Sequence, residues 1–220
     1  MTRSAVRRRK PPDERRAEIL TTASALASAE GLESLTLRRV ADELGVYPGL
    51  VSHYFQTVDE LVVAAFRHAV TSESAACYAA AVADEPTPLH RLAKLLVSLI
   101  GHERDGVSLL WLDAWSAFRH RAGLAVEVNR QMEADKQRLG ELIADGVAAG
   151  QFHTTDPTAS AARIYAVIDG LAVLAAVGPD VDYAAVHELV FTNAERELGV
   201  AAGDLHPSPV VDPVRRASDR

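Results

Sequence analysis

Apolar residues recur at spacings of three and four along nearly the whole of this 220-residue chain, and few stretches alternate with a period of two. The first spacing places apolar side chains on one face of a helix, whereas half-buried strands need the second. Alanine, a strong helix former, occurs 38 times. The sequence therefore predicts an all-α fold of about nine helices, expected at residues 12–30, 36–44, 48–55, 57–81, 89–100, 107–121, 124–149, 158–177 and 183–198.

Cys77 is the only cysteine, so the sequence offers neither an intrachain disulfide nor a cysteine set for zinc. We expect it to be a small buried apolar residue in a cytoplasmic protein. The longest apolar stretch, residues 164–178, is interrupted by Asp169 and predicts no membrane span. Residues 82–198 contain no HExxH, ExxH pair, GxGxxG, P-loop or GxSxG pattern. These absences predict a protein that is not an enzyme and that uses no metal or cofactor.

The formal net charge of −7 argues against a nucleic-acid partner, but the charge is unevenly distributed. Residues 1–60 hold nine basic and nine acidic side chains, whereas residues 61–220 hold 14 and 21. Residues 1–16 alone carry seven basic and two acidic side chains, a local charge of +5. We expect a flexible basic arm there, able to contact phosphates or the minor groove of DNA. The last twenty residues contain three prolines and predict a disordered tail.

Two short predicted helices, residues 36–44 and 48–55, flank a tight turn that contains Gly45. This is the helix-turn-helix arrangement, in which the second short helix is presented to the major groove. A helix of about eight residues is not stable by itself and must be held by packing. A helical hairpin with an amphipathic surface would give the same pattern. Spacing alone leaves both interpretations open.

The stretch from Ile19 to Leu61, with TLRRVADELGV followed by GLVSHYFQTVDEL, resembles the DNA-binding domain of the TetR family of bacterial regulators. The segment GLVSHYF is most similar to the BetI-type branch, whose members respond to choline. The chain departs from the family pattern at Tyr47 and Pro48, where Ser and a basic residue are usual, and at Val58, where Lys is common.

The resemblance implies four segments: a basic arm at 1–12, a helix-turn-helix domain at 13–57, an effector-binding and dimerisation domain at 58–199, and a disordered tail at 200–220. It also implies a transcriptional repressor that a small-molecule effector releases from a pseudo-palindromic operator. The departures at Tyr47, Pro48 and Val58 leave an alternative, a protein-binding adaptor of the same fold that has lost specific DNA binding.

The predicted DNA-binding residues lie on the two short helices. Arg38 is expected to place its guanidinium against guanine O6 and N7, and Arg39 to bind a phosphate. Tyr47 at the head of the second short helix suits a thymine methyl group or a phosphate. Tyr54 suits either a phosphate contact or packing. The full predicted set is Thr36, Arg38, Arg39, Tyr47, Pro48, Gly49, Ser52, His53 and Tyr54.

The segment LLWLDAWSAFRHR places Trp111, Trp115 and Phe118 on one helical face, and Asp113 on another. Tyr165 and Asp169 share a face of a later helix. A weaker resemblance to BetI-type regulators continues through WLxxW, GVAAGQF and IDGL. The five aromatic and acidic residues predict a site for a small, cationic effector, through cation–π contacts and ion pairing. The alternatives are an aromatic stripe that belongs to the core and a buried acid with a hydrogen-bond partner.

The predicted helices 158–177 and 183–198 are apolar enough to need cover on more than one side. Pairing them with a second copy would give a four-helix bundle and a homodimer with two recognition helices in successive major grooves. The predicted interface residues are Ala166, Gly170, Val173, Val177, Val190, Phe191 and Ala194.

Overall fold

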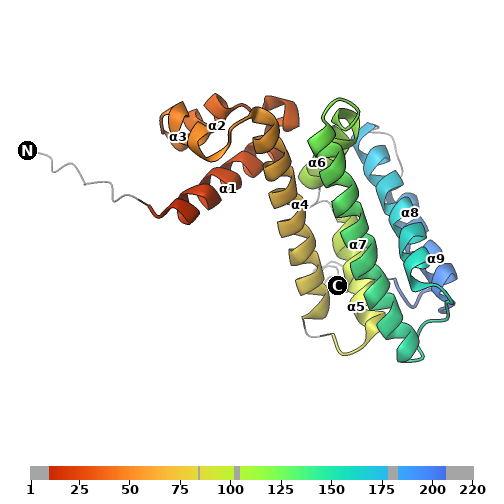
Figure 1. The fold of residues 1–220 in the computed structure, drawn as a ribbon. Coiled ribbons are helices and arrows are strands. Elements are labelled where there is room, and N and C mark those ends of the chain that lie inside the picture. Colours follow the sequence, from red (N-terminus) through yellow and green to blue (C-terminus); the bar gives the residue numbers. More distant parts are fainter. Residues whose placement is uncertain (1–9, 84, 102–104, 178–182, 207–220) are drawn as a thin grey trace, which may run out of the picture. The chain divides into compact units, whose positions relative to one another are not determined.

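The computed structural model describes residues 10–83, 85–101, 105–177 and 183–206, and over these residues it contains helices and no strand. The all-α prediction is therefore confirmed. The α-helices, labelled in Figure 1, are α1 (Pro12–Glu30), α2 (Leu37–Leu44), α3 (Pro48–Tyr54), α4 (Val58–Val82), α5 (Pro88–Ile100), α6 (Asp105–Ala117), α7 (Ala122–Ala148), α8 (Pro157–Val177) and α9 (Tyr183–Leu198). A short 3-10 helix, η1 (Leu32–Ser34), lies between α1 and α2 in the sequence.

The chain forms two compact units. Residues 1–73 and 106–132 make the first unit, and residues 74–105 and 133–220 make the second. The first unit thus contains α1, α2 and α3, most of α6, the beginning of α4 and the beginning of α7. Among the described residues no helix is long and apolar enough to cross a membrane.

Local signals in the sequence begin and end the short helices of the first unit. The hydroxyl of Thr36 accepts a hydrogen bond from the Arg39 N–H at 2.9 Å, which caps α2. Gly45, at a φ of 62°, ends α2 in the left-handed conformation that glycine adopts without strain. Pro48 is the first residue of α3. The Glu60 N–H donates to the Thr57 hydroxyl at 3.1 Å where α4 begins. The helices expected to begin at residues 36, 48 and 57 therefore begin within one residue of those positions.

The core of the first unit holds the helix-turn-helix in place. Val40 of α2, Val51 of α3 and Phe55 are fully buried, together with Ile19 of α1 and Phe66 of α4. Because α3 is only seven residues long, this burial supplies the stability that its length does not.

The second unit has its own core, and that core includes residues beyond α9. Leu205 is fully buried, and its N–H and that of Gly203 donate to the Glu195 carboxylate at 3.1 and 2.9 Å. The predicted disordered tail is therefore wrong for residues 200–206, because a buried carboxylate fixes their backbone. Residues 1–9 of the predicted arm and 207–220 of the predicted tail lie outside the described residues.

Candidate nucleic-acid interface

The head of α3 projects into solvent. Tyr47, the residue before the helix, has 89% of its surface exposed, and Pro48 and Gly49 are exposed beside it. No atom lies within 4 Å of the position that a Cβ would take at Gly49. The first turn of α3 carries no acidic residue. An approaching duplex would therefore meet no side chain at Gly49 and no carboxylate from the first turn of α3.

The two adjacent arginines of α2 differ in environment. Arg38 has 83% of its side chain exposed and forms a 3.8 Å ion pair with Asp42, one helical turn away. Arg39 donates to Glu30 at 2.6 Å and to Glu43 at 2.8 Å. Hydrogen bonds that Arg39 donates to these carboxylates raise its pKa, and the bond to Glu30 lowers the pKa of that carboxyl group. Arg38 is thus placed to reach outward, whereas Arg39 is held against its neighbours.

The remaining predicted contacts are divided between exposed groups and groups that already have intramolecular partners. His53 is exposed, and its ring meets the Tyr54 ring edge-on with centroids 5.3 Å apart. Tyr54 is half-buried and packs against the core of the first unit. Ser52 donates its hydroxyl hydrogen to the Pro48 carbonyl at 3.1 Å. The Thr36 hydroxyl, although exposed, caps α2.

The tryptophans of α6 lie in the core of the first unit. Trp111 is 9% exposed and meets the Phe66 ring edge-on at 5.1 Å between centroids. Trp115 lies 5.6 Å from Trp111 and is partly buried. Phe118 is 43% exposed, because α6 ends at Ala117 and not at Arg121 as predicted, so the periodic stripe stops before it. This arrangement matches the interpretation of the stripe as core.

Tyr165 and Asp169, the other predicted effector residues, belong to the second unit, where both are half-buried on α8. The hydroxyl of Tyr165 lies 3.4 Å from that of Tyr78 on α4. Burial raises the pKa of Tyr78 to about 12, so its phenol is neutral at physiological pH. The structure thus assigns the five predicted residues to two units and does not gather them in either one.

A polar cluster around Tyr78 was missed by sequence reasoning. The Arg138 guanidinium of α7 lies 4.1 Å from the centroid of the Tyr78 ring. Arg138 also donates to the Ser74 hydroxyl at 3.2 Å, and Ser74 donates to Asp135 at 2.9 Å. The spacing of four between Ser74 and Tyr78 places both on one face of α4, which is the signal that could have identified them.

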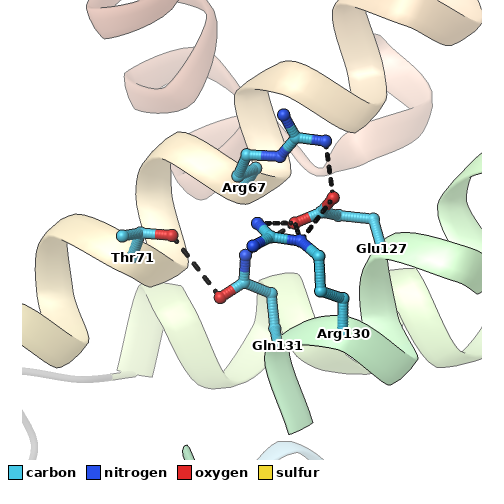
Figure 2. A network of polar contacts seen from close by, with 5 residues as sticks. All are labelled: Arg67, Thr71, Glu127, Arg130 and Gln131. Carbon is cyan, nitrogen blue, oxygen red and sulfur yellow. Dashed lines mark hydrogen bonds and ion pairs between the residues drawn. The ribbon is translucent and has the colours of Figure 1, made fainter. Parts of the chain in front are cut away.

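A second missed cluster links α4 to α7 within the first unit, as Figure 2 shows. Glu127 is 2% exposed and accepts hydrogen bonds from Arg67, Arg130 and Gln131, each at 2.6 Å. Thr71 donates to Gln131 at 3.4 Å. Burial by itself would raise the pKa of Glu127, but the hydrogen bonds outweigh it and lower the pKa to about 2. Glu127 is therefore ionised at neutral pH and holds the two helices together.

The predicted dimer residues also separate into two groups. Ala166, Gly170 and Val173 of α8 are exposed. Val190, Phe191 and Ala194 of α9 are buried in the core of their own unit, which corrects the prediction that they face a partner. Periodicity identified an apolar face of α9, and this face packs inside the chain. The Val177 side chain lies outside the described residues. Periodicity also missed two exposed apolar residues, Leu174 of α8 and Leu189 of α9.

The geometry defines a class of protein: an all-helical chain whose first unit presents a helix-turn-helix with an exposed recognition helix. Comparison with known proteins agrees. The family described as "Bacterial regulatory proteins, tetR family" matches residues 19–65, and "BetI-type transcriptional repressor, C-terminal" matches residues 88–199. The chain belongs to the TetR family and carries a BetI-type C-terminal region. It is a DNA-binding transcriptional regulator.

Two curated relatives are the HTH-type transcriptional regulators BetI of Brucella anthropi and Paraburkholderia phymatum. The first is 29% identical over 173 residues, which cover 78% of this chain and 86% of the relative. The second is 28% identical over 172 residues, which cover 76% and 83%. Both relatives are transcriptional regulators.

Two solved structures share the fold. A TetR-family regulator from a Rhodococcus species has a TM-score of 0.73 at 21% identity and covers 84% of this chain and 99% of that one. A transcriptional regulator from Saccharomonospora viridis, solved in complex with choline, has a TM-score of 0.71 at 21% identity and covers 84% and 98%.

Proposed function

We propose that α2 and α3 bind the major groove of a pseudo-palindromic operator, with Arg38 and Tyr47 as the leading contacts. The observation that carries this proposal is the exposed head of α3, held from behind by the buried Val51 and Phe55. A short helix that inserts into a groove needs one face packed rigidly against the core and the opposite face exposed and polar.

We propose that two copies of the chain bind the operator together. From Ala166 onward, the exposed residues described in α8 are small or apolar, namely Ala166, Gly170, Val173 and Leu174, whereas the exposed Thr158 and Arg163 lie nearer its start. Leu189 of α9 is 53% exposed. Such a surface suits close approach of the same helices from a second copy, which gives a four-helix bundle with two-fold symmetry. Two-fold symmetry in turn requires an operator with two inverted half-sites.

Selection of duplexes from a random library with the full chain tests both proposals. We expect two inverted half-sites about one helical turn apart, or a multiple of it. Arg38→Ala is expected to weaken binding to the selected duplex by about 1–3 kcal/mol and to relax the preference at one base pair, because a bidentate contact to guanine is lost. Arg119→Ala is the control, since it removes the same charge from an exposed position outside α2 and α3.

Equal affinity and equal selectivity of the Arg38→Ala and Arg119→Ala proteins would remove Arg38 from the interface. A selected site with a single half-site would contradict the dimer. Failure of the wild-type chain to select any sequence would favour the adaptor that retains the fold without specific DNA binding.

We further propose that the effector is a small organic cation bound in the second unit near Tyr78, Tyr165 and Asp169. The Tyr78 ring contacts a cation, the Arg138 guanidinium at 4.1 Å, so an organic cation on this ring face would take the place of Arg138. The structurally similar regulator from Saccharomonospora viridis binds choline, and choline has the corresponding chemistry. The acid at Asp169 supplies the negative charge that a quaternary ammonium ion requires.

Calorimetric titration with choline and glycine betaine, paired with operator-binding assays, tests the effector proposal. An effector of this kind is expected to weaken operator binding by about 5- to 150-fold at saturation. The uncharged analogue 3,3-dimethylbutan-1-ol has the shape of choline without its charge and is expected to have no effect. No heat of binding and no change in operator affinity with either cation would contradict a site for this class of ligand.

A further inference from the structure

Helix α6 makes a polar contact with the turn that follows α1. The Leu32 N–H donates to the Asp113 carboxylate, with 2.9 Å between the backbone nitrogen and Oδ2. Both residues belong to the first unit. A carboxylate that accepts a hydrogen bond from a backbone amide makes a stronger bond than a neutral acceptor, and it fixes the chain at that point.

Gly31 makes this contact possible. Its φ is +85°, a conformation that residues with a side chain rarely adopt. A Cβ at Gly31 would lie 2.8 Å from Oδ2 of Asp113, so a side chain would push the carboxylate away. The backbone conformation and the close approach therefore both require glycine, and they support the Asp113 contact independently of the hydrogen bond itself.

The same turn is linked to α2 and to the segment between α6 and α7. Glu30, just before Gly31, binds Arg39 of α2 at 2.6 Å. Glu33, just after Leu32, lies 3.5 Å from Arg121, which also pairs with Asp59 of α4. A displacement of this turn would therefore shift α2 through the Glu30–Arg39 ion pair. It would also shift α3, because only a short turn joins α2 to α3.

The other face of α6 contacts the core. Trp111 precedes Asp113 by two residues, which is about 200° around the helix, and it packs against Phe66 of α4. Helix α6 is thus fixed on one side by an aromatic contact and on the other by the turn after α1. A rotation of α6 about its own axis would therefore shift both Trp111 against Phe66 and Asp113 against Leu32.

We propose that Asp113 is a positioning residue for operator binding, which sets the orientation of α2 and α3 through the turn at residues 30–33. Asp113 is half-buried and bonded to the backbone, so it acts through the turn and not on DNA. The proposal rests on operator binding by α2 and α3 as described above. It predicts that loss of the contact lowers specific affinity while leaving the charge-driven attraction to any duplex intact.

The test compares binding to the duplex selected by the wild-type chain with binding to a scrambled duplex of the same length. Asp113→Ala is expected to lower specific affinity about ten-fold and to leave non-specific affinity unchanged. Asp113→Asn retains an oxygen acceptor for the Leu32 N–H and is expected to restore the wild-type ratio. Ser24→Ala is the matched control, because it removes a 3.0 Å bond from α1 to the Ala65 carbonyl of α4 without touching the turn.

If Asp113 has only a structural role, Asp113→Ala and Ser24→Ala will both lower the melting temperature while the ratio of specific to non-specific affinity stays at the wild-type value. That result overturns the proposal. If Asp113→Ala does not fold, Asp113→Ser provides the same comparison, because its hydroxyl is one bond shorter and keeps the site polar. A wild-type chain that does not discriminate between the two duplexes would overturn operator binding itself, and the positioning role with it.

Discussion

Replacing Gly146 by alanine is expected to lower the free energy of unfolding by about 3–5 kcal/mol, the range seen when a large buried aromatic side chain loses its site. A Cβ at Gly146 of α7 would lie 2.0 Å from Cδ2 of Phe152, and the ring of Phe152 is 2% exposed. The N–H groups of Gln151 and Phe152 both donate to the Gly146 carbonyl, at 2.9 and 3.2 Å. The chain therefore returns over the helix at this residue, and the ring has no space into which it can retreat.

Gly140→Ala is the matched control for this experiment, since it makes the same change in the same helix. The nearest atom to its added Cβ would be the Thr158 Cα at 3.5 Å, an ordinary contact. We expect this variant to be unchanged or more stable by up to about 1 kcal/mol, because alanine favours the helix over glycine. Urea denaturation of both variants gives the two free energies. Similar free energies of unfolding for Gly146→Ala and Gly140→Ala would show that the packing of Phe152 does not depend on the absence of a side chain at Gly146.

Glu127→Gln is expected to lower the free energy of unfolding at pH 7 by about 2–3 kcal/mol. The estimate follows from the fall in the pKa of Glu127 from 4.5 to about 2, at about 1.4 kcal/mol for each unit, reduced because both arginine partners are about half exposed. Gln retains a hydrogen-bonding side chain of the same size. The loss therefore reports the charge of Glu127 and not its volume.

The pH dependence gives a sharper form of the same prediction. Because the pKa is lowered in the folded state, the stabilisation is complete above the unfolded pKa of 4.5 and disappears as the pH falls through about 2. The difference between wild type and Glu127→Gln should therefore decrease steadily from about pH 5 downward. Glu133→Gln, at a 67% exposed position on the same helix, should change little at any pH. A difference for Glu127→Gln that is independent of pH would contradict this account.

Local chemistry explains which features could be predicted from the sequence. The Thr36 cap, the left-handed Gly45 and Pro48 at the start of α3 depend on residues within a few positions of one another. Their outcomes follow from backbone stereochemistry alone, and the structure confirms them. The helix-turn-helix could be predicted for the same reason, and the resemblance of residues 19–61 to a known family removed the remaining ambiguity.

Features that depend on packing between distant segments could not be predicted. Periodicity placed Trp111 and Phe191 on apolar faces, but it could not say that both faces are covered within the same chain. The contacts of Asp113 with Leu32 and of Glu127 with Arg67 join residues 81 and 60 positions apart. A single sequence carries no signal for pairing over such separations, because each polar residue has many possible partners.

The neighbouring Arg38 and Arg39 also bear on how the binding preference of such a protein changes in evolution. Substitution of Arg38 breaks one loose contact with Asp42 at 3.8 Å, so the fold tolerates many residues there. Substitution of Arg39 leaves Glu30 and Glu43 without the cation that now separates them. With Arg38 as the proposed base contact, new binding preferences would arise by drift at that position without compensating mutations, whereas a change at Arg39 needs simultaneous changes elsewhere. A lineage of such regulators can diverge in target genes while its architecture stays constant.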